Sequence, residues 1–408
     1  MNDALKSADI LLPKQGIDLS KWAVVACDQF TAQPEYWRET ERIVSEAPSA
    51  LRVTLPEVYL SEAETRIPAI HRTMREYLRE GVWQVAVKNG FVLVCRETGT
   101  GIRPGLMVCL DLDQYDFNPG SHSLIRPTEG TVVSRVPPRA KIRAGAPVEL
   151  PHVMMLIDDP GYTIIEPLLE KRDALRPLYD LELMQAGGHL KGWAVEGGDV
   201  EGVYAAIHKL REHCDGLLYA VGDGNHSLAA AKQCWLDIKE HLSPEQREQH
   251  PARYAMVELV NLACPSLIFE PIHRVVYHAN ANALMSEYKE YLLANGAEMG
   301  EGDDLIVFTK SSAWRFASKQ HPLRLLQAFL DDYLARHPEA EIDYIHGDDA
   351  VKALVQRGDA VGFMPRAFDK AELFPYIQKW GVLPRKTFSM GEANEKRYYL
   401  EARRILPE

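Results

Sequence analysis

The residues best suited to chemistry lie in the stretch from Tyr219 to Lys232. An apolar run, Gly216 to Val221, predicts a buried strand. A glycine-rich turn follows, with a carboxylate at Asp223 and an imidazole at His226. We expect Ser227 to cap the alanine-rich helix that comes next.

The order of strand, glycine turn and helix start indicates an anion-binding site. The first backbone N–H groups of a helix have no partners within it, and the helix dipole favours negative charge at that end. The turn lacks both the Gly-Lys-Ser/Thr ending of a P-loop and the third glycine of a dinucleotide-binding fingerprint. An ordinary strand–turn–helix connection uses the same residue types, and this alternative stays open.

A second group of polar residues lies in the loop from Leu124 to Val133. Arg126, Glu129 and Thr131 stand there between apolar stretches. A carboxylate beside several arginines stays ionised, so Glu129 can orient or deprotonate a hydroxyl group. Arginines in the same loop can hold phosphate oxygens. A solvated basic loop with an incidental glutamate is the alternative.

Two further basic segments lie towards the C-terminus. His273 and Arg274 follow a strand-like stretch, a position that suits phosphate or carboxylate binding. Lys386 lies in a basic turn after Gly381. A structural histidine beside a surface arginine, and a positively charged turn, would account for the same residues. Glu57 is a further acid at the end of an apolar stretch.

Five segments, taken in order, resemble the family catalogued as domain of unknown function 1015. Along the chain, the family's R-P-E segment is matched by Leu55 to Glu57, and its H-E-x-T segment by Thr128 to Thr131. Its D-G-H-H-R segment is matched by Asp223 to Ser227, and its P-T-H-R segment by Pro271 to Arg274. Its M-P-x-K-S/T segment is matched by Leu383 to Thr387. Each match is short, but together they span most of the chain.

The resemblance implies a reaction. The D-G-H-H-R segment is similar to that of the ParB/sulfiredoxin superfamily, which includes kinases of free L-serine. It therefore implies phosphoryl transfer from ATP or ADP, with Mg²⁺, to a free hydroxyl amino acid such as L-serine. The chain departs from the family segments at Thr128, Asn225 and Ser227, where the family has His, His and Arg. The loss of the arginine favours an alternative, a nucleotide- or metabolite-binding regulatory protein of the same fold without turnover.

The resemblance also implies a role for each residue. Glu129 would orient the attacking hydroxyl, Asp223 would hold Mg²⁺, and His226 would act beside them. The residues expected to bind the nucleotide are Gly224, Asn225, His226 and Ser227. The residues expected to bind phosphate or substrate are Arg126, Thr131, His273, Arg274, Lys386 and Glu57.

The elements that position these residues predict a mixed α/β fold. We expect residues 1–150 to form a strand-rich part that carries the Glu129 loop. Residues 151–280 would be an α/β core with the Asp-Gly-Asn-His turn, and residues 281–408 a C-terminal α/β part. All three would pack as one compact unit. From the resemblance, the core is expected to be ParB/sulfiredoxin-like.

Local patterns predict individual elements of the N-terminal part. Helices are expected at residues 34–45 and 62–80, and extended segments at 22–27 and 51–60. Lys88-Asn89-Gly90 separates two apolar runs and predicts a hairpin within residues 84–95.

Composition limits the class of protein. The net charge is −12, which disfavours binding to nucleic acid. The chain contains no 18-residue apolar run and no N-terminal apolar segment of the signal-peptide kind, so we expect a cytoplasmic protein without a membrane span. Six scattered cysteines without a C-x-x-C pair argue against a zinc site. The expected ligands are a nucleotide and a small-molecule substrate, and a homodimer is a possible assembly.

Overall fold

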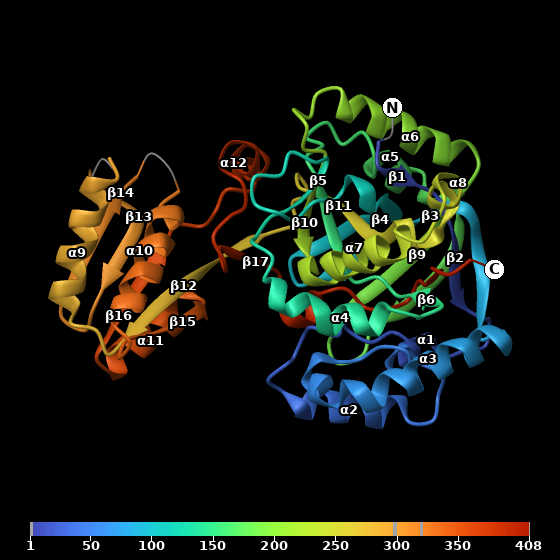
Figure 1. Cartoon of the computed structure of the whole chain (residues 1–408), viewed down its shortest axis with the longest axis horizontal. Coiled ribbons are helices and arrows are strands. Elements are labelled where there is room, and N and C mark those ends of the chain that lie inside the picture. The colour runs from blue at the N-terminus through green and yellow to red at the C-terminus, as the bar shows by residue number, and fades with distance from the viewer. Residues whose placement is uncertain (1–2, 297–299, 319–320, 408) are drawn as a thin grey trace. The chain divides into compact units, whose positions relative to one another are not determined.

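The computed structural model describes residues 3–296, 300–318 and 321–407, and it confirms the mixed α/β class (Figure 1). The chain divides into two compact units. Unit 1 comprises Met1–Leu267 and Glu392–Glu408, and unit 2 comprises Ile268–Gly391. Unit 2 is therefore an insertion in the sequence of unit 1.

The described part of unit 1 is built on a ten-stranded sheet. Its main path runs in the order β5-β10-β7-β11-β4-β3-β9-β8, while β1 pairs with β4 and β2 pairs with β3. The boundary expected near residue 150 falls within this sheet, because strands from both sides of it pair with each other. The strands are β1 (Leu5–Lys6), β2 (Ala8–Pro13), β3 (Trp83–Thr98), β4 (Gly101–Asp111), β5 (Ile125–Pro127), β7 (Met154–Ile157), β8 (Arg176–Glu182), β9 (His189–Val195), β10 (Tyr219–Asp223) and β11 (Tyr254–Asn261).

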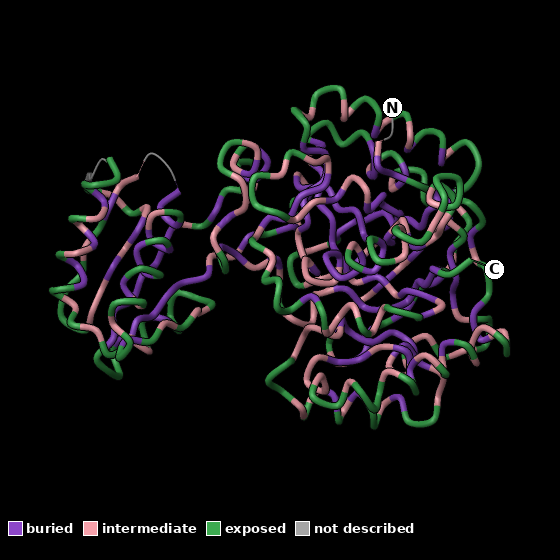
Figure 2. Tube along the Cα trace, in the orientation of Figure 1, coloured by how far each residue is buried: buried purple, intermediate pink, exposed green. Residues whose placement is uncertain are grey.

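Both faces of this sheet are covered. Successive residues of a strand point to opposite faces, and β3 shows this clearly. Phe91 and Leu93 belong to one apolar core, while Val92 and Val94 belong to the other. The central strands β4, β7 and β11 are accordingly buried along most of their length (Figure 2). The helices of unit 1 are α1 (Leu19–Trp22), α2 (Pro34–Val44), α3 (Ala63–Arg79), α4 (Val136–Arg143), α5 (Glu166–Glu170), α6 (Gly198–Arg211), α7 (Asn225–Lys239) and α8 (Pro244–Gln249).

The segment after unit 2 returns to the interior of unit 1. Arg397 forms a buried ion pair with Glu258 at 2.8 Å and also pairs with Glu401. Arg403 pairs with Glu149 at 2.6 Å, where β18 (Arg403–Arg404) pairs with β6 (Val148–Glu149). Burial alone would raise the pKa of the Glu258 carboxyl, but the adjacent Arg397 holds it below its ordinary value. The segment is thus anchored by charge inside the core.

Unit 2 is a second α/β body. Its sheet runs in the order β14-β13-β16-β12-β15, with β17 paired to β12. The strands are β12 (Phe269–Tyr277), β13 (Gly300–Phe308), β14 (Ala313–Ala317), β15 (Glu341–His346), β16 (Ala360–Pro365) and β17 (Phe388–Met390). The helices are α9 (Ala281–Ala294), α10 (Leu323–Arg336), α11 (Asp348–Arg357) and α12 (Leu373–Trp380).

Three local predictions for the N-terminal part are wrong. Residues 51–60 hold 3₁₀ turns at Ala50–Arg52 and Glu57–Glu62 instead of an extended segment. The strand expected at 22–27 follows a short helix and makes one isolated bridge, Val25 to Tyr398. The predicted hairpin at Lys88-Asn89-Gly90 is part of the continuous strand β3.

The two longer helices predicted for this part are confirmed as α2 and α3. Pro68 is accommodated within α3. Among the described residues, no helix has both the length and the apolar character needed to cross a membrane.

Candidate functional site

Two loops of unit 1 meet because their strands are parallel. β5 and β10 pair in parallel, with Tyr219 opposite Ile125 and Val221 opposite Pro127. The carboxyl ends of parallel strands lie at the same edge of a sheet. The Thr128 hydroxyl donates to the Val221 carbonyl at 2.8 Å and fastens the start of one loop to the other strand. The Glu129 loop and the Asp223 turn therefore lie side by side.

The turn after β10 depends on Gly224. This residue has φ +76° and stands immediately before α7. A Cβ atom here would lie 3.0 Å from the Cα of Val153, so only glycine fits without movement of the backbone. The helix begins at Asn225, and the expectation that Ser227 caps it is wrong. Ser227 lies in the first turn instead.

The Asn225 side chain joins the two loops. Its Nδ2 donates to the Glu129 carbonyl at 3.1 Å and to the Thr131 hydroxyl at 3.0 Å. Its Oδ1 accepts from the Tyr115 hydroxyl at 3.2 Å. The amide thus holds the backbone of the Glu129 loop against the first turn of α7. Glu129 itself is partly exposed.

Asp223 is held as a carboxylate. Its Oδ2 lies 3.1 Å from Nζ of Lys396, and its Oδ1 accepts from the Gly224 N–H at 2.9 Å. Burial alone would raise the pKa of Asp223, but the positive charge of Lys396 and these hydrogen bonds hold it below its ordinary value. Lys396 comes from the segment that follows unit 2 in the sequence.

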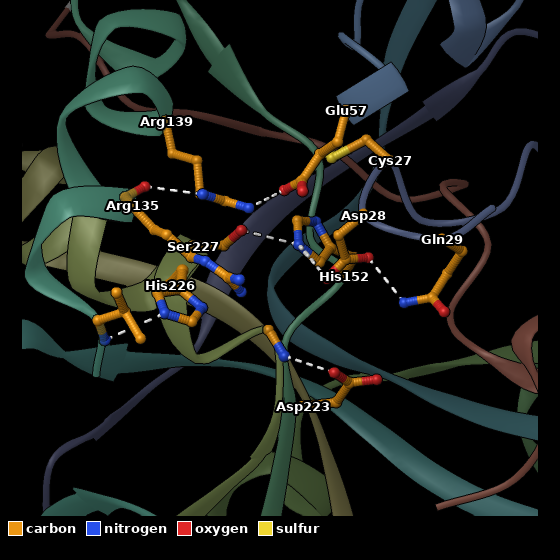
Figure 3. Close-up of polar contacts among 12 residues, drawn as sticks. Cys27, Asp28, Gln29, Glu57, Arg135, Arg139, His152, Asp223, His226 and Ser227 are labelled. Atoms are coloured by element: carbon orange, nitrogen blue, oxygen red, sulfur yellow. Dashed lines mark hydrogen bonds and ion pairs between the residues drawn. The ribbon is translucent and has the colours of Figure 1, made fainter. Parts of the chain in front are cut away.

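His226 is neutral and lies among arginines (Figure 3). Its Nε2 accepts from the Val132 N–H at 3.2 Å, which places the ring proton on Nδ1. Burial, with the charges of Arg139 and Arg135, lowers the pKa of His226 to about 4. The start of α7 therefore faces a positively charged surface of α4 and the turn that precedes it.

Ser227 ends a chain of hydrogen bonds. Its hydroxyl lies 2.8 Å from Nε2 of His152, and Nδ1 of His152 lies 2.8 Å from the Tyr399 hydroxyl (Figure 3 shows the first contact). The Tyr399 oxygen in turn accepts from the Cys27 N–H at 3.1 Å. Asp28 lies 3.9 Å from His152 Nε2. Ser227, which stands where the family segment has arginine, is therefore held by a hydrogen-bonded chain through His152 and Tyr399.

Glu57 pairs with Arg139 at the edge of this group (Figure 3). Both side chains are largely buried, at 15% and 14% exposed. Burial raises the pKa of Glu57, and Arg139 opposes that rise. The position of Glu57 is set by its backbone N–H, which donates to the Cys27 carbonyl at 2.8 Å.

Four other predicted residues are described by contacts of their own. Arg126 is buried on β5, where its Nη1 donates to the Ser121 carbonyl at 3.3 Å. His273, Arg274 and Lys386 belong to unit 2. There, His273 Nε2 lies 2.9 Å from Asp348, Arg274 is fully buried and donates to the Arg385 carbonyl, and Lys386 is exposed. Their roles at a site stay predictions.

Sequence reasoning missed four residues of the group: Arg139, His152, Lys396 and Tyr399. Arg139 was visible only as one of several basic residues that follow the Glu129 loop. His152, Lys396 and Tyr399 carry no motif, and only the fold brings them to the turn.

The donor set fits a metal ion that arrives with a ligand. Within the part of the chain that the structure describes, no cluster of three or more His, Cys, Asp or Glu side chains could hold a metal. Asp223 offers one carboxylate, and Lys396 already pairs with it. Mg²⁺ is commonly bound through one or two carboxylates together with substrate phosphates and water. Asp223 is the carboxylate of this group that could act in this way, and its role as a metal ligand stays a prediction.

The fold and the site define a mixed α/β protein with a charged cluster at the N-terminus of a helix. The chain belongs to the family described as "Protein of unknown function (DUF1015)", whose model matches residues 11–356. No curated protein matches the chain.

Three solved structures are similar over most of the chain. A conserved hypothetical protein from Pyrococcus furiosus is 12% identical and covers 72% of this chain and 90% of its own, with a TM-score of 0.36. A free serine kinase variant in complex with ADP is 11% identical, with coverages of 74% and 92% and a TM-score of 0.39. C-terminally truncated SbnI from Staphylococcus aureus is 7% identical, with coverages of 70% and 82% and a TM-score of 0.38.

Proposed function

We propose that the protein is a phosphotransferase that moves a phosphoryl group from ATP or ADP to a free hydroxyl amino acid such as L-serine. One observation carries the proposal. The N-terminus of α7 lies beside the Asp223–Lys396 pair, and Asn225 holds the Glu129 loop against it. Anion binding, charge neutralisation and a carboxylate base are the components that phosphoryl transfer requires.

The proposed reaction uses these groups in order. The nucleotide phosphates bind at the turn from Gly224 to Ser227, at the backbone N–H groups of Asn225 and His226 and at the side chains of His226 and Ser227, with Lys396 and Arg139 nearby as counter-charges. Glu129 takes the proton of the acceptor hydroxyl as its oxygen attacks the terminal phosphorus, and the nucleotide leaves shortened by one phosphate. Mg²⁺, when bound, neutralises charge on the phosphates.

The roles of neutral His226 and of Ser227 follow from their protonation. His226 presents Nδ1–H and can donate to a phosphate oxygen. Ser227 can do the same if it accepts its own hydrogen bond from His152 Nε2–H. Neutral donors would then replace the arginine of the family segment. The absence of nucleic-acid and membrane partners, the homodimer and the cytoplasmic location stay predictions from the sequence.

A regulatory protein that binds a nucleotide or metabolite without turnover is the second candidate. Two observations favour it: Ser227 replaces the arginine, and Lys396 already neutralises Asp223. Such a protein would bind the ligand at the same helix start and would catalyse no transfer.

The first test is a pair of substitutions. Glu129→Gln keeps the shape of the side chain but removes the base, so the transfer rate should fall by roughly 10²–10⁴ while nucleotide affinity stays nearly unchanged. Asp223→Asn should weaken Mg²⁺-nucleotide binding as well as turnover, because a metal ligand acts in the ground state and the transition state alike. Calorimetric titration with Mg²⁺-ADP and Mg²⁺-ATP, and a phosphorylation assay with L-serine, give both quantities.

The matched control is Glu64→Gln, at a glutamate whose side chain is 84% exposed. It should leave both affinity and rate unchanged. Wild-type turnover in Glu129→Gln would remove the assignment of the base. Nucleotide binding to the wild-type protein without transfer to any hydroxyl compound would favour the regulatory candidate instead.

A further inference from the structure

A cavity of about 140 Å³ adjoins the candidate site in unit 1. Ser227, His152, Glu57 and Arg139 form part of its lining, and these residues are also members of the polar group beside α7 (Figure 3). The cavity therefore adjoins the first turn of α7, where an anion is proposed to bind.

The rest of the cavity wall is mostly apolar. Side chains from several elements contribute: Leu55, Met74, Ile142, Val148, Leu228 and Met256. Ala230 and Ala231 line it from α7, where their small side chains leave space that larger residues would fill. A concave space lined mostly by apolar side chains, with a few polar groups at one side, is typical of a small-molecule site.

The charged residues of the wall neutralise each other. Arg139 pairs with Glu57, and Arg143 pairs with Glu149 at 2.5 Å. Glu149 is paired a second time, to Arg403. The cavity consequently offers no net charge to a ligand, and its selectivity has to come from shape and apolar contact.

We propose that this cavity binds the apolar group of the small molecule whose hydroxyl faces α7. Its volume is close to the roughly 150 Å³ of an apolar protein cavity that binds benzene. The ligand is thus a hydroxyl compound whose apolar portion is about the size of a benzene ring or a branched aliphatic side chain. The assignment of this ligand as the phosphoryl acceptor rests on the proposed function, whereas the binding site itself does not.

Benzyl alcohol is a suitable probe because it joins a hydroxyl to a ring of that size. Calorimetry on the full chain should show saturable binding with a negative heat-capacity change, as apolar burial requires, and the melting temperature should rise with benzyl alcohol concentration. Ala231→Val places two methyl groups in the cavity and should weaken binding at least tenfold. Met74→Phe adds volume from α3, on a different element, and should also weaken it.

Ala229→Val is the matched control. Ala229 is a fully buried alanine of the same helix, but it is outside the cavity lining. This variant should lose stability through overpacking yet bind benzyl alcohol as the wild-type protein does. Circular dichroism and melting temperature show whether each variant is folded, and either filling variant suffices if the other is not.

The outcomes separate the two proposals. No saturable binding to the wild-type protein, or equal binding by the folded filling variants, would overturn the cavity site. Binding that is lost in the filling variants supports it. If those variants phosphorylate benzyl alcohol, or any hydroxyl compound with a similar apolar group, as fast as the wild-type protein, the acceptor assignment is overturned while the kinase stands. If benzyl alcohol binds but no hydroxyl compound is ever phosphorylated, the kinase fails and the cavity site remains.

Discussion

At the scale of single residues, His226 has the most unusual environment of the candidate site. Burial and two arginines oppose its protonation, and its Nε2 is occupied as an acceptor for the Val132 N–H. A protonated ring would lose this hydrogen bond and add a third positive charge. The folded protein therefore prefers the neutral ring.

This preference predicts a pH dependence of stability. The pKa of His226 is about 4 in the folded protein and about 6.5 in an unfolded chain. Between these values the unfolded state binds the proton and the folded state does not, so stability falls as pH falls from about 6.5 towards 4. His226→Gln should remove this part of the decline. Urea unfolding of both proteins at pH 7 and pH 5 measures the difference.

The control for this prediction is His122→Gln, at an exposed histidine. It changes the histidine count equally and should leave the pH dependence as in the wild-type protein. An identical decline in wild type and His226→Gln would show that His226 is protonated in the folded state.

The residues that the sequence could indicate are those that lie close together along the chain. Asp223 to Ser227 and Glu129 to Thr131 each form a short pattern of glycine, carboxylate and hydroxyl, and the structure places these two segments in contact through Asn225. Lys396 and His152 could not be found this way. Their side chains reach the turn only through packing of distant segments.

At the scale of elements, glycine has a different purpose at different positions. The sequence Lys88-Asn89-Gly90 has the composition of a hairpin turn, yet β3 continues through it. A Cβ at Gly90 would lie 2.5 Å from the Val195 carbonyl oxygen of β9. The glycine allows a neighbouring strand to approach, and this requirement depends on a residue far away in the sequence. The longer helices, by contrast, follow local periodicity and were predictable.

Gly224 has both a positive φ and a close backbone neighbour, so its substitution can be compared with that of Gly216, which has only the positive φ. Both have positive φ, +76° and +79°, but a Cβ at Gly216 meets nothing within 4 Å. Gly216→Ala should cost only the left-handed backbone term, about 1–2 kcal/mol. Gly224→Ala should cost more, because Val153 must also move, and it should weaken nucleotide binding. Urea unfolding and nucleotide titration test the pair; equal costs would show that the turn adapts readily.

At the scale of the whole molecule, the buried ion pairs of the last segment are the clearest test of how unit 1 is held together. Arg397 is 3% exposed and pairs with Glu258 and Glu401. Arg397→Met would leave two carboxylates buried without their counter-charge. Removal of one partner from a buried ion pair typically costs about 3–5 kcal/mol. We expect a loss of this size in urea unfolding.

The control for Arg397→Met is Arg42→Met. Arg42 also pairs with a glutamate, Glu39, but its side chain is 74% exposed. Exposed pairs contribute roughly 0–1 kcal/mol, so this variant should unfold nearly as the wild-type protein does. Equal effects of the two substitutions would mean that water reaches Arg397.

The sequence predicted the longer helices better than it predicted the boundaries of the two units. The predicted limits at residues 150 and 280 followed changes in the pattern of predicted strands and helices along the chain. The structure joins residues 392–407 to unit 1 through contacts with β6, Asp223 and His152, which no local pattern reveals. The charged residues Arg397, Glu401 and Arg403 of this segment are buried.

The insertion of unit 2 has a consequence for synthesis of the chain. A ribosome makes β10, α7 and the Glu129 loop first, then all of unit 2, and only afterwards Lys396 and Tyr399. A polypeptide that stops anywhere within unit 2 therefore has the helix start but lacks the lysine beside Asp223 and the tyrosine behind His152. Truncated products cannot assemble the candidate site. The complete site can therefore form only after the whole of unit 2 has been translated.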